Sequence, residues 1–116
     1  MVCHLSDAFL VALGEKSASR SINVFTRTVV KWIGLGPLPW PPGVPTRPEI
    51  DQCRGAGTKP SEFAEDLAAL AALMERFAAD PNLEREPHPL FGPMTRAEWL
   101  RWGWLHVDHH LRQFGA

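Results

Sequence analysis

One stretch of the chain decides the fold and carries the main candidate site: residues 95–114, TRAEWLRWGWLHVDHHLRQF. It opens with Thr95 and, three residues later, Glu98. This is the spacing of a capping box, in which each side chain accepts a hydrogen bond from the other residue's backbone N–H. The apolar and aromatic residues that follow recur at helical spacing. The pattern predicts a helix that begins at Thr95 and continues through Gln113.

Within this predicted helix, His106 and His110 are four residues apart and share a face with Gln113. Side chains at that spacing are neighbours on a helix, so two imidazoles can reach one metal ion. The pair borders the apolar seam of the helix. His109 falls at the wetter edge, and we expect it at the surface or behind a metal ligand. The spacing alone leaves a second interpretation open, in which both histidines are ordinary core or surface residues.

The length and composition of the chain limit the classes of protein it can belong to. A chain of 116 residues corresponds to a single domain, residues 1–116. Its formal net charge of -1 and the lack of a long Lys/Arg stripe argue against a nucleic-acid partner. Its apolar runs are shorter than the roughly 20 residues of a membrane span, so we expect no membrane partner. Cys3 and Cys53 match neither a metal-binding nor a disulfide pattern, which favours the reducing cytoplasm.

Three more helices are predicted, which makes the fold class an all-α bundle. They cover residues 2–13, ended by Gly14; residues 21–33, where many β-branched residues weaken the pattern; and residues 60–79, beginning near Pro60. Residues 36–58 are rich in Pro and Gly and predict a long, extended crossover. The third helix is expected to bury one apolar stripe, made of Phe63, Leu67, Leu70, Met74 and Phe77.

His4 is the candidate for a third metal ligand, because its helical neighbours are small and apolar. Cys3 is turned about 100° away from His4 on a helix and ranks behind the histidines. His88 has a proline on each side, which predicts an extended structural turn, with the ring at a pocket mouth as the alternative. Tryptophan residues on the last helix are expected either to line a pocket or to fill the core; they are Trp99, Trp102 and Trp104.

Several of these blocks, taken together, resemble a known group of proteins. The segment 2–7 (VCHLSD), the long crossover and the final HVDHHLRQ resemble the DinB/YfiT-like superfamily of metal-binding four-helix bundles. Segments 88–92 (HPLFG) and 95–99 (TRAEW) resemble, more narrowly, an uncharacterised bacterial branch of it. The resemblance implies that His4, His106 and His110 ligate a divalent metal such as zinc or nickel, with Gln113 nearby.

The resemblance also implies classes of activity. Characterised members of the superfamily include transferases and isomerases that use low-molecular-weight thiols. We therefore expect a metal-dependent thiol transferase or hydrolase with a small-molecule substrate. The competing hypothesis is a non-catalytic interaction or stress-response bundle whose metal site is structural or vestigial. Catalytic residues stay unassigned, because Asp7 and Glu98 are candidates for a general base by proximity only.

One further expectation concerns the start of the bundle. Members of the superfamily usually have a complete helix before the one that carries the first histidine, whereas this chain begins almost at His4. Two alternatives follow: residues 21–33 fill the place of that helix, or two chains share the exposed apolar face as a homodimer.

Overall fold

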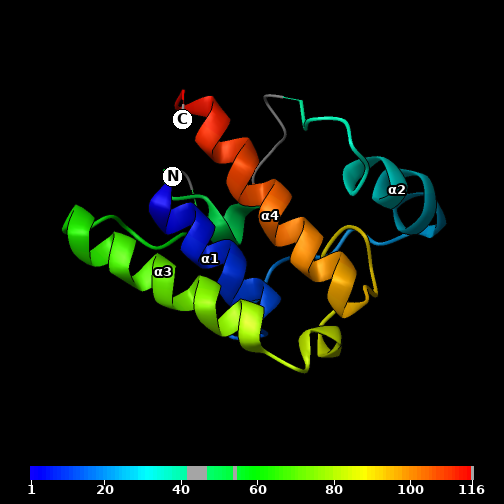
Figure 1. Cartoon of the computed structure of the whole chain (residues 1–116), viewed down its shortest axis with the longest axis horizontal. Helices are drawn as coiled ribbons and strands as arrows, with labels where there is room; N and C mark the ends of the chain where they lie inside the picture. Colours follow the sequence, from blue (N-terminus) through cyan, green and yellow to red (C-terminus); the bar gives the residue numbers. More distant parts are fainter. Residues whose placement is uncertain (42–46, 54, 116) are drawn as a thin grey trace.

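The computed structural model describes residues 1–41, 47–53 and 55–115, and within these ranges the fold is all-α, as predicted. Its helices are α1 (Val2–Ala12), α2 (Lys31–Gly34), α3 (Phe63–Ala79) and α4 (Arg96–Gln113). A π-helical segment, Thr26–Val30, leads into α2, and short 3-10 turns cover Pro48–Ile50 and Leu83–Arg85. In Figure 1, α1 lies between α3 and α4, and α2 stands apart on the other side of α4.

The two helices that carry the histidines have boundaries close to those predicted. α1 is followed by Leu13 and Gly14, and Gly14 has a φ of +77°, a left-handed conformation that suits the end of a helix. At the start of α4, the Glu98 N–H donates to Thr95 Oγ1 at 3.1 Å, and the Thr95 N–H donates to Glu98 Oε1 at 3.0 Å. The predicted capping box is therefore confirmed.

Aromatic side chains form the centre of the core, where α1, α3 and α4 meet. The Phe9 ring packs edge to face on Phe77 at 5.0 Å and on Trp102 at 5.9 Å between centroids. Trp99 is 1% exposed. Gly103 allows this close packing, because a Cβ there would lie 2.8 Å from a ring carbon of Phe77. These contacts hold α1 against α4 and thereby set the position of His4 relative to the last helix.

The segment predicted as a helix over residues 21–33 differs from the expectation. Helical structure begins only at residue 24, since Asn23 and Thr26 cap the segment reciprocally: each backbone N–H donates to the other's side-chain oxygen, at 2.8 and 2.9 Å. Phe25 and Trp32 are mostly exposed. Of the two alternatives for the missing bundle helix, the structure does not favour this segment, because it lies apart from α1 and α3 (Figure 1).

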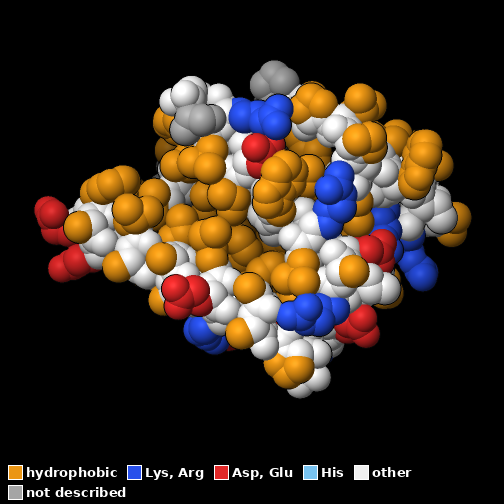
Figure 2. Space-filling model, in the orientation of Figure 1, with side chains coloured by type: hydrophobic (Ala, Val, Ile, Leu, Met, Phe, Trp, Pro, Cys, Tyr) orange, Lys and Arg blue, Asp and Glu red, His pale blue; other side chains and the backbone are white. Residues whose placement is uncertain are grey.

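The apolar stripe predicted on α3 is wrong in part. The helix begins at Phe63, a little later than expected, and its buried residues are Leu70, Leu73 and Phe77. Three members of the predicted stripe are exposed: Phe63, Leu67 and Met74. The reason is that α1 and α4 cover only one side of α3. Figure 2 shows apolar side chains gathered over α3 and the region between it and α4.

The predicted crossover is irregular where it is described, apart from the 3-10 turn at Pro48–Ile50. Its residues 42–46 and 54 lie outside the described residues. Both cysteines are free thiols, with Cys3 buried and Cys53 exposed. Among the described residues, no helix has the length and apolar character needed to cross a membrane.

Candidate metal centre

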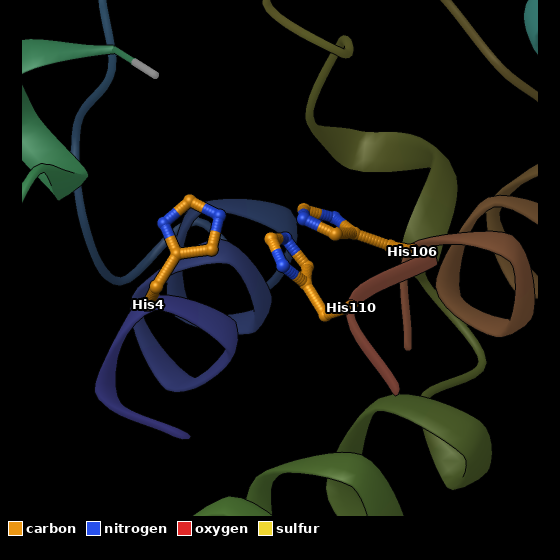
Figure 3. Close-up of side chains that lie close together, drawn as sticks. All are labelled: His4, His106 and His110. Carbon is orange, nitrogen blue, oxygen red and sulfur yellow. The ribbon is translucent and has the colours of Figure 1, made fainter. Parts of the chain in front are cut away.

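The structure brings His4, His106 and His110 together, although they lie at opposite ends of the chain. One ring nitrogen from each forms a set whose members all lie within 4.8 Å of one another. Figure 3 shows the three rings pointing toward one another, one from α1 and two from α4. The His4 ring centroid is 4.8 Å from that of His110, which is 5.1 Å from that of His106. The arrangement expected from the spacing and the resemblance is therefore present.

Hydrogen bonds orient two of the three rings. Nδ1 of His4 lies 3.2 Å from the carbonyl oxygen of Ile50, and Nδ1 of His110 lies 2.9 Å from Oε1 of Gln113. Both oxygens are acceptors, so each Nδ1 carries the proton and donates. In the neutral rings this leaves the Nε2 lone pairs free. Histidines that bind metals usually donate their other ring N–H in this way.

His106 is the most enclosed of the three. Its ring lies 4.9 Å from the Trp102 ring and 5.6 Å from the Trp40 ring, measured between centroids. Its Nδ1 is buried with no hydrogen-bond partner among the described residues. A buried polar nitrogen without a partner costs free energy. Three imidazoles with two oriented rings and one unpaired, buried nitrogen form a donor set that fits a divalent transition metal.

The environment keeps all three imidazoles neutral near neutral pH. Burial lowers the pKa of His106 well below its ordinary value, and the nearby histidines lower it further. Burial, together with His4, lowers the pKa of His110 to about 4. Burial also lowers the pKa of His4, despite the opposing effect of the Ile50 carbonyl. Because a metal binds the neutral form of imidazole, these shifts favour coordination.

The three histidines open onto a cleft of about 1120 Å³. Trp99 and Trp102 line it and are also buried in the core, so both roles considered for them apply. Trp104 has neither role and is 60% exposed. Trp40, from the Pro-rich crossover, also lines the cleft and is held by its indole N–H, which donates to the carbonyl oxygen of Gly34 at 2.6 Å.

Two sequence neighbours of the three histidines lie outside the cluster, as predicted. His109 is half-buried beside Trp40, with 5.7 Å between ring centroids, and lines the cleft. Cys3 belongs to a different environment. Burial raises the pKa of its thiol, and the nearby Asp66 carboxylate raises it further. Neither residue belongs to the group of three.

Neither Asp7 nor Glu98, the two residues considered as a general base by proximity, lines the cleft, and the catalytic residues stay unassigned. Asp7 is fully buried, accepts hydrogen bonds from the Thr58 N–H and hydroxyl, and pairs with Lys16 at 3.1 Å. Burial raises the pKa of Asp7, but these partners outweigh that effect and lower it overall. Glu98 caps α4 and pairs with Lys31 at 2.9 Å. The cap made by Glu98 was predicted from the sequence, whereas its pairing with Lys31 and the partners of Asp7 were not.

His88 has both of the roles considered for it. Its backbone forms the predicted turn, with two hydrogen bonds to Gly92 of 2.8 and 3.0 Å. Its ring stacks on Phe91, with 4.4 Å between centroids, and lines the cleft. Sequence reasoning assigned no role to Arg47 or Trp40, which also line the cleft. The only sequence feature that could have pointed to these two residues is the presence of a cationic and an aromatic side chain within the Pro-rich crossover.

Comparisons with known proteins identify a family but no characterised relative. No curated protein and no solved structure matches this chain. Residues 16–116 match the model of a family described as "Protein of unknown function (DUF1569)". The matched region contains His88, His106 and His110, and it begins after His4. Since the match covers most of its residues, the chain belongs to the DUF1569 family.

Proposed function

We propose that this chain binds one divalent transition metal, zinc or nickel, through His4, His106 and His110, and that it is a metal-dependent thiol transferase or hydrolase. The observation that carries the proposal is the convergence of three neutral imidazoles, with ligand atoms within 4.8 Å of one another, beside an open cleft. Three protein ligands leave a fourth position for water or substrate, as in catalytic zinc sites.

The number of protein ligands supports a metal site with a free coordination position. Structural zinc sites are usually closed by four protein ligands, whereas the group found among the described residues has three. A divalent metal held there would lower the pKa of a water or thiol at the open position and supply a nucleophile near neutral pH. The resemblance to DinB-like proteins supports the same ligand set and points to small thiols as co-substrates.

The chain's own residues orient the ligands and limit access to water. Ile50 and Gln113 hold the His4 and His110 rings through Nδ1, and Trp40 and Trp102 cover His106. Asp7 and Glu98 are engaged elsewhere, so the proposal assigns no general base.

The second candidate function is a non-catalytic, homodimeric bundle with a structural or vestigial site. Exposed apolar side chains on α3, on α4 and just after α4 favour it, notably Phe63, Leu67, Trp104 and Phe114. Large exposed apolar surfaces often mark protein–protein interfaces. Light scattering tests whether the chain forms a homodimer, and metal content tests the metal site. The two measurements are therefore independent.

Elemental analysis of untagged protein, purified without chelator, tests the proposal. We expect about one zinc or nickel per chain in the unmodified protein and none in His106→Ala. His109→Ala is the matched control, because its ring lies in the same segment outside the group of three, and it should keep the metal. Circular dichroism verifies that each variant is folded. Equal metal content in the unmodified protein and His106→Ala would contradict the proposal.

A further inference from the structure

The ring of His88 has one tautomer set by the fold. Its Nδ1 accepts hydrogen bonds from the backbone N–H groups of Leu90 and Phe91, both at 3.1 Å. An imidazole nitrogen that accepts has no proton, so the neutral ring carries its proton on Nε2. Burial, with the nearby charge of Arg47, lowers the pKa of His88 to about 3. The ring is thus a neutral N–H donor at working pH, and its Nε2 has no hydrogen bond to any described residue.

Two more donors belong to the same cleft. Trp99 has its indole N–H buried with no acceptor among the described residues, and its ring lies 5.6 Å from that of His88. Arg47 also lines the cleft and donates to the Ser21 hydroxyl at 3.0 Å. The pKa of Glu49 is lowered by hydrogen bonds from its own backbone and from Ser19, with a smaller contribution from the charge of Arg47, and Glu49 lies outside the cleft lining.

The described lining of the cleft contains no Asp or Glu. Arg47 is therefore the formal charge on that described surface, and it lies close enough to His88 for its charge to lower the pKa of that ring. Buried donors that lack an acceptor favour a ligand that brings its own. An arginine guanidinium is the side chain best suited to hold a carboxylate.

We propose that this end of the cleft is an anion subsite, formed by Arg47, the Nε2–H of His88 and the indole of Trp99, which selects substrates that carry a carboxylate. The Trp102 ring lies between the subsite and the three histidines, 5.7 Å from the His88 ring and 4.9 Å from the His106 ring. Both groups of residues line the same cleft, so the proposal places one end of the substrate at the subsite and the other at the histidines. This inference rests on the proposed function in one respect, because it assumes that the reacting group of the substrate lies at the three histidines.

The test compares two probes with the same carbon skeleton, 3-phenylpropionate, which ends in a carboxylate, and 3-phenylpropan-1-ol, which ends in a neutral hydroxyl. Tryptophan fluorescence reports binding, since three tryptophans line the cleft: Trp40, Trp99 and Trp102. We expect the unmodified chain to bind the carboxylate about tenfold more tightly than the alcohol. Arg47→Gln should abolish this preference and Arg47→Lys should retain part of it. Arg20→Gln, a control at a surface ion pair with Glu86, should leave it unchanged.

Each titration is run on the protein as purified and again after chelation, which separates the subsite from the metal. A preference that survives chelation and is lost in Arg47→Gln supports the subsite, even if elemental analysis refutes the metal site. A preference that disappears on chelation and survives Arg47→Gln means that the carboxylate binds the metal, and this overturns the subsite while the metal site stands. Equal affinity for both probes in the unmodified protein also overturns it.

Discussion

The two halves of α4 belong to one helix but lie in different surroundings. In the first half, Trp99 and Trp102 are buried in the core against α3, where both contact Phe77, and Trp102 also contacts Phe9 of α1. In the second half, His106 and His110 face a cleft, and the side chains of Arg112 and Gln113 are exposed. The first half therefore holds the fold together, and the second half presents ligands on it. This arrangement implies that stability and metal affinity can be changed separately.

The largest effect is expected from Trp99→Ala, in the first half. The side chain is 1% exposed, so its truncation leaves a cavity and should lower the free energy of unfolding by about 3–5 kcal/mol. Urea denaturation measures this. Trp104→Ala is the matched control on the same helix, where the side chain is 60% exposed and the change should stay below about 0.5 kcal/mol. Similar losses for both variants would contradict the division of α4.

Acid should destabilise the protein through His88, which packs on the first half of α4. Its folded pKa of about 3 lies below the ordinary 6.5, so the unfolded chain gains a proton first as the pH falls. The stabilisation is complete above pH 6.5 and decreases toward pH 3 by about 1.4 kcal/mol per pH unit. Urea denaturation from pH 7 to 4, in chelator, should give a shallower pH dependence for His88→Gln. An unchanged slope would show that this ring does not stay neutral in the fold.

Gln113→Ala, in the second half of α4, should change metal affinity but not stability. It removes the acceptor that orients His110, so metal affinity should fall about 10–100-fold while urea stability of the metal-free protein is unchanged. Competition with a colorimetric chelator measures the affinity. Arg112→Ala is the adjacent control, because Arg112 pairs with Asp108 at 2.8 Å on another face. If both variants bind metal as the unmodified protein does, Gln113 has no orienting role.

Thr95→Ala should give the smallest effect, and in contrast to Gln113→Ala it should change stability but not metal affinity. Loss of the capping hydroxyl should lower the free energy of unfolding by about 1 kcal/mol, with metal affinity retained in the folded protein. The same two assays apply. A large loss of metal affinity would mean that the start of α4 and its histidines are coupled more strongly than the structure indicates.

Sequence reasoning succeeds here where the signal is local. The Thr95 and Glu98 capping box and Gly14 after α1 act through neighbouring residues, and both are confirmed. The spacing of His106 and His110 likewise defines a shared face. Tertiary partners decide the rest. The α3 stripe and the position of residues 21–33 depend on which helices cover them, and periodicity alone does not contain that information.

The same distinction holds for the candidate site. His4 is remote in sequence from His106, so only the resemblance suggested that they meet, and contacts between α1 and α4 bring them together. The cleft could not be inferred, because its walls come from the crossover, the His88 turn and α4. Arg47 had no local motif to mark it.

X-ray absorption spectroscopy of the zinc- or nickel-loaded protein tests the central claim most directly. We predict three imidazole nitrogens at about 2.0–2.1 Å for zinc, with one further light donor that a small thiol replaces. His4→Ala should lose one imidazole from the spectrum, since His4 is the ligand contributed by α1. A closed shell of four protein ligands, or a spectrum that His4→Ala leaves unchanged, would contradict the account.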